Sequence, residues 1–266
     1  MIPNELINTI VKQDATEYLS SLPDESVDLF IIDPPYNIGF DGNKGWDKQW
    51  KTEEEYLLWC KGWLEQAWRA LKTGRVLVVW GTLKTDTFLK FKLQLLNELP
   101  GALARTEIIW ENNWGGRSKK DFARKHEYAW VYSKGENVVW NPNEVRIPRK
   151  MKKNIRTGED YTEGTIPTAI WQLQNHTTSK DYVGWHSTPK NLDAIGRLVK
   201  AYSNIGDIVV DPFMGSASTA VAAVRASRFY SGCELDDEFL EKSAERIRKS
   251  VPKTLFDDEK QEEGSP

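Results

Sequence analysis

The run Asp33-Pro34-Pro35-Tyr36 gathers groups that could hold an amino nitrogen while it attacks a methyl donor. It directly follows residues 27–32, a nearly continuous apolar run that predicts a strand buried on both faces of a parallel sheet. The two prolines restrict the backbone and leave carbonyl oxygens free, and Asp33 adds a carboxylate acceptor. Such acceptors orient a nitrogen lone pair and stabilise the charge that develops on it, while Tyr36 offers a face for base stacking. The alternative interpretation is a Pro-Pro turn at a strand end, with an aromatic ring packed beneath it.

A second run of residues, 207–219, has the layout of a nucleoside-cofactor loop. A predicted strand enters a turn of small residues around Gly215, and a helix follows from Ser218. A residue without Cβ lets the backbone approach a ligand, although this run is neither GxGxxG nor a P-loop. The next predicted strand ends at Cys233-Glu234, where a carboxylate can accept hydrogen bonds from ribose hydroxyls. A capped strand-turn-helix unit without a ligand is the alternative.

The rest of the chain predicts the scaffold that positions these two motifs. Apolar runs predict strands at 7–11, 27–32, 75–80, 106–110, 128–132, 207–210 and 229–232. Helical periodicity and capping signals predict helices at 15–22, 53–71, 85–96, 189–202, 218–226 and 237–250. This alternation indicates a doubly wound α/β sheet, in which ligands bind beyond the carboxyl ends of the strands.

The middle of the chain lacks this alternation. Residues 137–185 show little periodicity and contain several prolines, which indicates an irregular, loop-rich insertion. We therefore divide the chain into residues 1–136 with the first motif, an inserted region at 137–185, and residues 186–250 with the cofactor loop. The acidic tail, 251–266, is expected to be disordered.

Charge is distributed unevenly along the 266 residues, whose net charge is -3. Residues 115–156 carry twelve Lys and Arg against four Asp and Glu, whereas residues 1–60 carry four against twelve. A basic block in an acidic protein is a candidate surface for DNA phosphates, and a solvated loop without a partner is the alternative. The candidate DNA contacts are Arg117, Lys119, Lys120, Arg124, Lys125, Arg146, Arg149, Lys150, Lys152, Lys153 and Arg156.

Other features of the composition indicate an ordinary globular protein of a reducing compartment. No apolar run approaches the length of a membrane span, and the first residues do not have the pattern of a signal peptide. Cys60 and Cys233 have no Cys or His at metal-ligand spacing and are expected to be buried free thiols. We therefore expect a cytoplasmic protein without a bound metal. Most of the twelve tryptophans are expected to fill the core.

The order of these motifs resembles that of the β class of DNA amino-methyltransferases, over about residues 7–250. In that class the catalytic tetrapeptide precedes the cofactor loop, and the target-recognition region lies between them. The matching segments are Gln13-Asp14-Ala15, Asp33 to Tyr36 followed by Asn37, His186-Ser-Thr-Pro-Lys190, the loop residues Asp211, Phe213, Gly215 and Ser216, and the ribose-binding acid Glu234.

The resemblance implies a Rossmann-like methyltransferase fold with a circularly permuted motif order and S-adenosylmethionine as methyl donor. It implies a site-specific, adenine-specific DNA N6-methyltransferase, prokaryotic or phage-encoded, of the kind found in restriction-modification systems. The enzyme would act on a base flipped out of double-stranded DNA, without a covalent enzyme intermediate. Homodimers are common in the class. The implied catalytic residues are Asp33, Pro34, Pro35 and Tyr36. The implied cofactor-binding residues are Asp14, Ala15, Asp33, Lys190, Asp211, Pro212, Phe213, Gly215, Ser216, Ser218 and Glu234.

The sequence departs from the class at Ala217, which replaces the second glycine of the usual Gly-Ser-Gly-Thr. If that position needs a positive φ, the alanine costs about 1 kcal/mol. The Pro and Gln of the usual His-Pro-Thr-Gln-Lys segment are altered as well.

Several alternatives remain beside adenine N6. Cytosine N4 is the nearest, although such enzymes more often carry Ser or Thr in place of Asp33. Cytosine C5 chemistry needs a nucleophilic thiol, and neither cysteine follows a proline as in that family. RNA and protein-glutamine methyltransferases usually have the cofactor loop first. A non-catalytic DNA-binding protein on the same fold is the alternative from another class. The recognition sequence is not encoded in any of these patterns.

Overall fold

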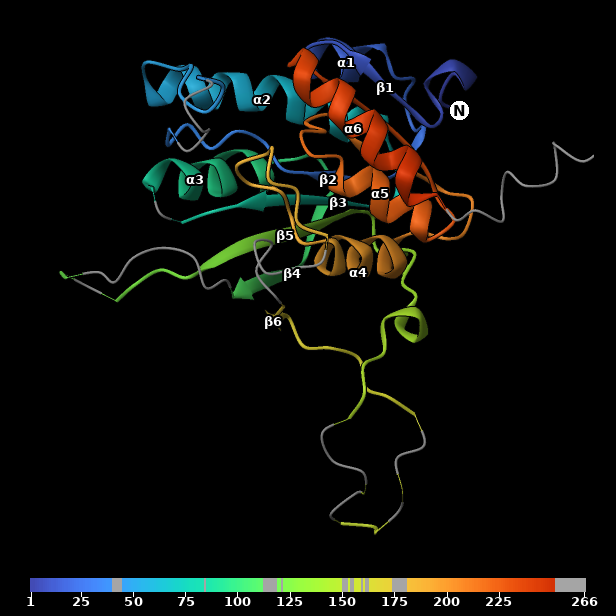
Figure 1. Cartoon of the computed structure of the whole chain (residues 1–266). Helices are drawn as coiled ribbons and strands as arrows, with labels where there is room; N and C mark the ends of the chain where they lie inside the picture. The colour runs from blue at the N-terminus through green and yellow to red at the C-terminus, as the bar shows by residue number, and fades with distance from the viewer. Residues whose placement is uncertain are drawn as a thin grey trace, which may run out of the picture.

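A single eight-stranded sheet organises the chain in the computed structural model (Figure 1). The structure describes residues 1–39, 45–83, 85–111, 119–120, 122–149, 153, 156–158, 160, 163–173 and 181–251. Arg117, Lys150, Lys152 and the predicted tail from residue 252 onward lie outside the described residues.

The sheet is parallel except for one reversed strand, and its order is β1-β8-β7-β2-β3-β5-β4-β6. The strand bounds are β1 Thr9–Lys12, β2 Val27–Ile32, β3 Leu71–Gly81, β4 Ala102–Glu111, β5 His126–Lys134, β6 Ile170–Gln172, β7 Ile208–Asp211 and β8 Phe229–Glu234. β5 runs antiparallel to both of its neighbours, β3 and β4. The amino end of β5 therefore lies at the sheet edge where the other strands have their carboxyl ends.

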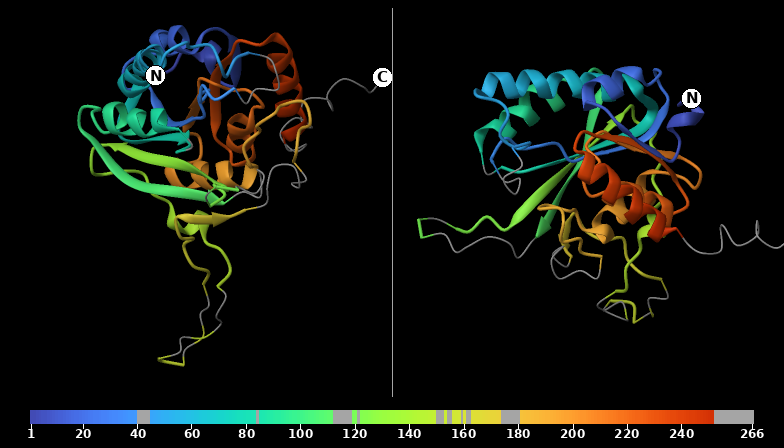
Figure 2. Two further views of the ribbon diagram at one scale, coloured as in Figure 1. Left: turned by 90° about the vertical axis from the view of Figure 1, so that its left-hand side faces the viewer. Right: turned by 45° about the horizontal axis from the view of Figure 1, so that its top comes forward.

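Helices cover both faces of this sheet (Figures 1 and 2). The helix bounds are α1 Ala15–Ser21, α2 Glu53–Ala70, α3 Asp86–Phe91, α4 Leu192–Tyr202, α5 Ser218–Arg225 and α6 Asp237–Ser250. One hydrophobic cluster joins the sheet to α1, α2 and α3, and a second joins it to α4, α5 and α6. The predicted doubly wound α/β fold is confirmed.

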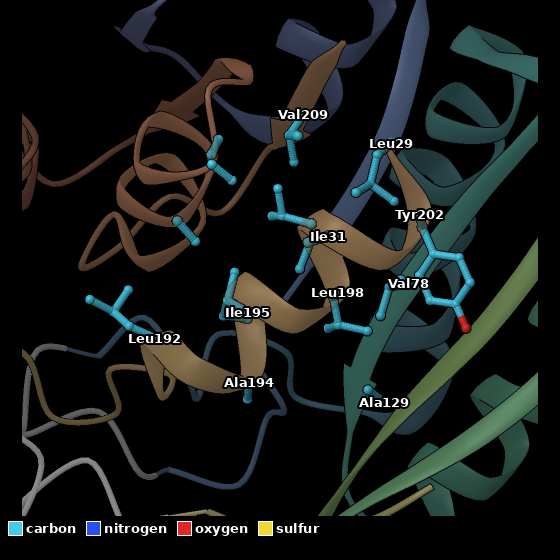
Figure 3. Packing of buried hydrophobic residues seen from close by; sticks show 14 of the residues in the cluster. Leu29, Ile31, Val78, Ala129, Leu192, Ala194, Ile195, Leu198, Tyr202 and Val209 are labelled. Atoms are coloured by element: carbon cyan, nitrogen blue, oxygen red, sulfur yellow. The ribbon is translucent and has the colours of Figure 1, made fainter. Parts of the chain in front are cut away.

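The central place of β2 in the sheet explains why the sequence of this strand is almost entirely apolar. All six of its residues are buried. Leu29 and Ile31 point toward α4 (Figure 3), while Phe30 belongs to the cluster under α1 and α2. Because successive side chains of a strand point to opposite faces, a strand covered on both sides needs apolar residues at nearly every position, and the exception, Asp28, is paired with Arg75.

Local boundaries follow recognisable signals. α2 begins with a capping box, in which the Thr52 side chain accepts from Glu55 N and the Glu55 side chain accepts from Thr52 N. The helix ends at Ala70, one residue before the end of the predicted helix 53–71. Gly74 lies inside β3 with φ +76°, next to the irregular pairing of β2 with β3. The predicted helix 85–96 is α3 followed by one π-helical stretch, Lys92–Leu96.

The predicted insertion, 137–185, contributes to the main sheet. A short 3-10 helix, Pro142–Val145, packs near α4, and β6 pairs with β4 at the sheet edge. Between them, Ile147 and Thr165 pair across an arm that projects away from the body of the molecule (Figure 1). Within the described ranges, no helix combines the length and apolarity that crossing a membrane requires.

Candidate active site

One cavity of about 500 Å³ lies at the carboxyl ends of the central strands. Ligand pockets commonly have volumes of this order. The strand order reverses between β7 and β2, because β7 leads through α5 to β8 on one side and β2 leads through α2 to β3 on the other. Open α/β sheets bind ligands at such a switch point. The cavity is lined by all the residues predicted to be catalytic or cofactor-binding: Asp14, Ala15, Asp33, Pro34, Pro35, Tyr36, Lys190, Asp211, Pro212, Phe213, Gly215, Ser216, Ser218 and Glu234.

Asp33 follows the last residue of β2 and is held by two donors. The Tyr36 hydroxyl donates to Asp33 Oδ1 at 2.8 Å, and Lys190 Nζ donates to Oδ2 at 2.6 Å. Burial raises the pKa of Asp33 above its ordinary value, Lys190 opposes the shift, and the negative charge of Glu127 adds to it. The carboxylate keeps lone pairs for a further donor, because each of its oxygens can accept more than one hydrogen bond.

The turn around Tyr36 is fixed from below by two side chains. Buried Asp47 accepts from the backbone N–H groups of Tyr36 at 2.5 Å and Asn37 at 2.8 Å. The Tyr56 hydroxyl donates to the Pro35 carbonyl at 2.8 Å. The Tyr36 ring packs edge-on against Phe88, with ring centroids 4.7 Å apart. Burial raises the pKa of Tyr36 well above its ordinary value, so the hydroxyl stays a donor to Asp33.

Lys190 bridges two carboxylates within this cavity. Its Nζ lies 3.2 Å from Glu127 Oε2 as well as 2.6 Å from Asp33 Oδ2. Burial alone would lower the pKa of Lys190, but the charges of Asp33 and Glu127 raise it above its ordinary value. The lysine is therefore a stable ammonium at neutral pH. Its backbone carbonyl accepts from Ser218 Oγ at 3.0 Å, which joins this cluster to the cofactor loop.

The loop between β7 and α5 contains two residues with positive φ, Gly215 and Ala217. Gly215 has φ +47°, and a Cβ there would lie 2.9 Å from His186 Nε2. Ala217 has φ 60° and ψ 28° at the amino end of α5, so the condition for strain at this position is met. The alanine methyl is fully buried in the cluster beneath α5, so its packing offsets part of the backbone strain.

Two carboxylates flank this loop. Glu234 accepts from the N–H groups of Gly215 at 2.7 Å, Leu235 at 2.8 Å and Asp236 at 2.9 Å. Asp211 accepts from Thr219 Oγ1 at 2.7 Å and from Phe213 N at 3.0 Å. Burial raises the pKa of Asp211 to about 7 and raises that of Glu234 as well. A cationic ligand in this cavity would therefore stabilise the ionised forms of these two acids.

α6 holds the loop from behind, which the sequence analysis did not anticipate. Ser243 Oγ donates to the Gly215 carbonyl at 2.5 Å, and Arg246 donates to the Ser216 carbonyl at 2.5 Å. Burial lowers the pKa of Arg246 to about 10. With these carbonyls occupied, the loop is fixed before any ligand arrives.

The far end of the cavity is formed by the start of α1 and by aromatic rings. Asp14 caps α1 by accepting from Thr16 N at 2.8 Å, and Ala15 is buried beside it. The Phe213 ring lies 5.6 Å from both Trp59 and Trp63, measured between centroids. Trp59 also lines the cavity, so this end offers an apolar aromatic surface beside an acid.

The described basic residues do not form one patch. Lys119, Lys120, Arg124 and Lys125 lie on the segment that leads into β5, whereas Arg146, Arg149, Lys153 and Arg156 lie on the projecting arm or its base. The two segments leave the sheet in different directions (Figure 1). Arg146 donates to the Gly164 carbonyl at 2.8 Å, so part of its guanidinium is used inside the arm. Lys125 is half-buried, and the other seven are exposed.

Three residues of this site, Glu127, Asp47 and Arg246, were not predicted from the sequence. Glu127 stands directly before the predicted strand 128–132, but only the antiparallel pairing of that strand with β3 brings it to Lys190. Asp47 and Arg246 carry no local signal, because Asp47 binds backbone N–H groups 9 to 11 residues away and Arg246 binds a carbonyl 30 residues away.

The fold and the cavity together define a nucleoside-cofactor-binding α/β protein with a second, charged compartment beside the cofactor loop. The chain belongs to the DNA methylase family of N6- and N4-methyltransferases, whose model matches residues 27–245. The predicted membership of this family is confirmed.

Proteins with similar sequences are also methyltransferases. The chain is 30% identical to the type II methyltransferase M.BglII of Bacillus subtilis, over 90% of this chain and 68% of that protein. It is 27% identical to the DNA adenine methyltransferase YhdJ of Escherichia coli K12, over 90% and 82% of the two chains.

Solved structures show the same fold. The PvuII DNA methyltransferase, described as cytosine-N4-specific, superposes with a TM-score of 0.69 at 20% identity, over 91% of this chain and 89% of that one. A putative DNA modification methylase of Thermus thermophilus, complexed with S-adenosyl-L-methionine, gives 0.62 at 21% identity, over 92% and 95%.

Proposed function

We propose that this DNA methyltransferase transfers a methyl group from S-adenosylmethionine to N6 of adenine in double-stranded DNA. The observation that carries the proposal is the single cavity that joins Asp33 to the Gly215 loop and Glu234. One part offers acceptors for an amino group, and the other offers acids and a close backbone approach for a nucleoside.

The residues of the cavity fit this cofactor. Glu234 keeps acceptor capacity for ribose hydroxyls, and Gly215 leaves its φ +47° turn free of a side chain. Asp14, Ala15 and Phe213 would hold the adenine end, and Asp211 and Ser216 the remaining part of the ligand. Bound S-adenosylmethionine supplies an electrophilic methyl group on a positively charged sulfur. The buried acids Asp211 and Glu234 favour a cation by charge.

Asp33 and the Pro34 carbonyl would accept the two hydrogens of the target amino group. Holding them directs the nitrogen lone pair and stabilises the positive charge that develops on nitrogen. The amino group cannot reach this cavity while its base is stacked in the duplex, so the base must be flipped out. Tyr36 lies on this part of the cavity and offers a ring surface for the base, while the indole of Trp80 is buried behind it. Adenine is favoured over cytosine because an aspartate, as in Asp33, is typical of adenine-N6 enzymes.

We also propose a division of labour along the chain. Residues 1–136 would carry catalysis, 186–250 would bind the cofactor, and the insertion 137–185 would read the target. The exposed basic residues before β5 and on the arm would contact phosphates, so binding to DNA should weaken steeply with salt.

The test is mass spectrometry of nucleosides from the DNA of cells that express the protein, with Asp33→Ala as the control. N6-methyladenine above the control is expected. N4-methylcytosine would keep the mechanism and replace the base. Calorimetry should show that Asp33→Ala still binds S-adenosylmethionine. Wild-type turnover by that variant would refute the role of Asp33. If wild-type protein binds DNA but forms neither methylated base, a non-catalytic role would be favoured.

A further inference from the structure

Glu127 is a half-buried carboxylate that the proposed methyl transfer does not use. It is the second residue of β5 and lines the cavity. Its Oε2 is shielded from solvent, lies 3.2 Å from Lys190 Nζ, and accepts no well-formed hydrogen bond from the described residues. A shielded carboxylate oxygen that is only partly satisfied is costly, so the position of Glu127 calls for a functional explanation.

Glu127 is the last member of a row of alternating charges. Asp33, Lys190 and Glu127 follow one another, with Lys190 Nζ 2.6 Å and 3.2 Å from the two carboxylates. The rings of Tyr36 and Trp80 also lie near the ammonium, each centroid 5.5 Å from Nζ. The row therefore offers an acceptor, a donor and a second acceptor beside the ring of Tyr36.

This order can be compared with the edge by which a flipped base is read. Along that edge adenine carries the N6 amino donor, the N1 acceptor and then C2–H, which has no lone pair. Cytosine carries the N4 amino donor, the N3 acceptor and then the O2 acceptor. With the amino group on Asp33, the first two positions of either base fit Asp33 and Lys190 equally. The third position differs: Glu127 would face C2–H of adenine but the lone pairs of cytosine O2.

We propose that Glu127 determines base specificity by repelling cytosine O2, a role that rests on the proposed amino transfer at Asp33. Two facing acceptors repel each other, and this repulsion rejects the wrong base more strongly than the mere absence of a favourable contact. We expect Glu127 to contribute about 10- to 100-fold to the preference for adenine. The same carboxylate would accept a hydrogen bond from a base that carries a donor at this third position.

The experiment uses three synthetic duplexes that differ only at the target base, built on the recognition sequence read from methylated genomic DNA. The target is adenine, cytosine or 2,6-diaminopurine, whose 2-amino group points a donor at Glu127. kcat/KM is measured for wild type, for Glu127→Gln and for Glu136→Gln, a matched control at an exposed glutamate just beyond β5. S-adenosylmethionine binding by each variant establishes that the fold is retained.

In Glu127→Gln, whose amide can donate to O2, the cytosine-to-adenine ratio should rise about 10- to 100-fold. The diaminopurine-to-adenine ratio should fall several-fold, and Glu136→Gln should change neither ratio. A purely structural role for Glu127 would lower all three rates together. Unchanged ratios in active enzyme would overturn the inference while leaving adenine methylation intact. If Glu127→Gln fails to fold, kcat/KM of the wild type on the diaminopurine and adenine duplexes still tests the inference. A much lower value for diaminopurine would contradict an acceptor at this position. N4-methylcytosine as the natural product would instead overturn the proposed function and this role with it.

Discussion

Replacing Lys190 by methionine should destabilise the protein in a pH-dependent way. The change leaves Asp33 and Glu127, whose contacts to Nζ are 2.6 Å and 3.2 Å, as two unpaired carboxylates in one cavity. Removing one member of a buried ion pair costs about 3–5 kcal/mol. The two acids retain exposed fractions of 25% and 22%, so solvent reduces the expected cost to about 2–3 kcal/mol near pH 8.

The sign of the pH dependence follows from the acids that remain. Burial already raises the pKa of Asp33, and loss of the ammonium raises it further. Between the ordinary pKa of a carboxyl and that raised pKa, the folded variant binds a proton that the unfolded chain does not bind. Stability of the variant relative to wild type should therefore recover as the pH falls toward 5, and decline as the pH rises through the folded pKa.

Urea unfolding of wild type and Lys190→Met near pH 5, 6.5 and 8 measures this difference. Lys242→Met, at a partly exposed lysine paired with Glu238 on α6, is the matched control and should change stability by less than about 0.5 kcal/mol. Adding Glu127→Gln to Lys190→Met should restore part of the loss at pH 8. A cost below about 1 kcal/mol, or one that is the same at every pH, would refute the assignment of a charge-coupled cluster.

Four further outcomes are expected. Ala217→Gly relieves about 1 kcal/mol of left-handed strain but removes a fully buried methyl worth about 0.8 kcal/mol, so urea unfolding should show a change below about 0.5 kcal/mol; a larger loss would mean that packing, not φ, dominates. Glu234→Gln should weaken S-adenosylmethionine binding about 10-fold by calorimetry because a charged acceptor is lost, and unchanged affinity would contradict the ribose assignment. The pKa of Asp211 is raised to about 7, so its contribution to stability is full below pH 3.8 and is lost as the pH rises through 7; relative to Asp211→Asn, wild type should lose up to about 4 kcal/mol over that window, and parallel pH profiles would argue against a protonated acid. Lys125→Gln should reduce the slope of log Kd against log salt for DNA by about one, while Lys249→Gln on α6 should leave it unchanged; equal slopes in both variants would remove Lys125 from the interface.

Much of this architecture could be predicted because its signals are local. The buried run 27–32 and the periodic helix 237–250 coincide with β2 and α6 as observed. Asp33 and Gly215 each follow a predicted strand, and parallel strands present their carboxyl ends at one edge. The sequence alone therefore predicts that both residues lie at one edge of the sheet.

The parts that could not be predicted depend on contacts between distant segments. The sequence shows a strand near residues 128–132, but its antiparallel placement beside β3 depends on pairing, and only that placement brings Glu127 to Lys190. β6 has three residues, too few for a periodic signal, and forms through pairing with β4. The basic block is continuous in sequence, yet β5 and the 3-10 helix after it divide the block between two directions in space.

The permuted motif order has no chemical consequence because the sheet makes the two motifs neighbours. β2 pairs directly with β7, through Leu29 with Val209 and Phe30 with Val210, so Asp33 and Asp211 end adjacent strands despite their separation in the chain. Parallel strands have no tight hairpin to set their register, so another contact must set it.

Asp28, at the amino end of β2, supplies that contact. It accepts from Ile208 N at 3.0 Å and pairs with Arg75 at 2.9 Å, while Arg75 also pairs with Asp207 at 2.6 Å. This buried network joins β2, β3 and β7 at the edge opposite the cavity. A slip of β2 by one residue would break both contacts of Asp28 and also turn the apolar side chains of β2 to the wrong face. The distance between the amino-holding and cofactor-holding halves of the site is therefore set by charges at the far end of the sheet, outside the site itself.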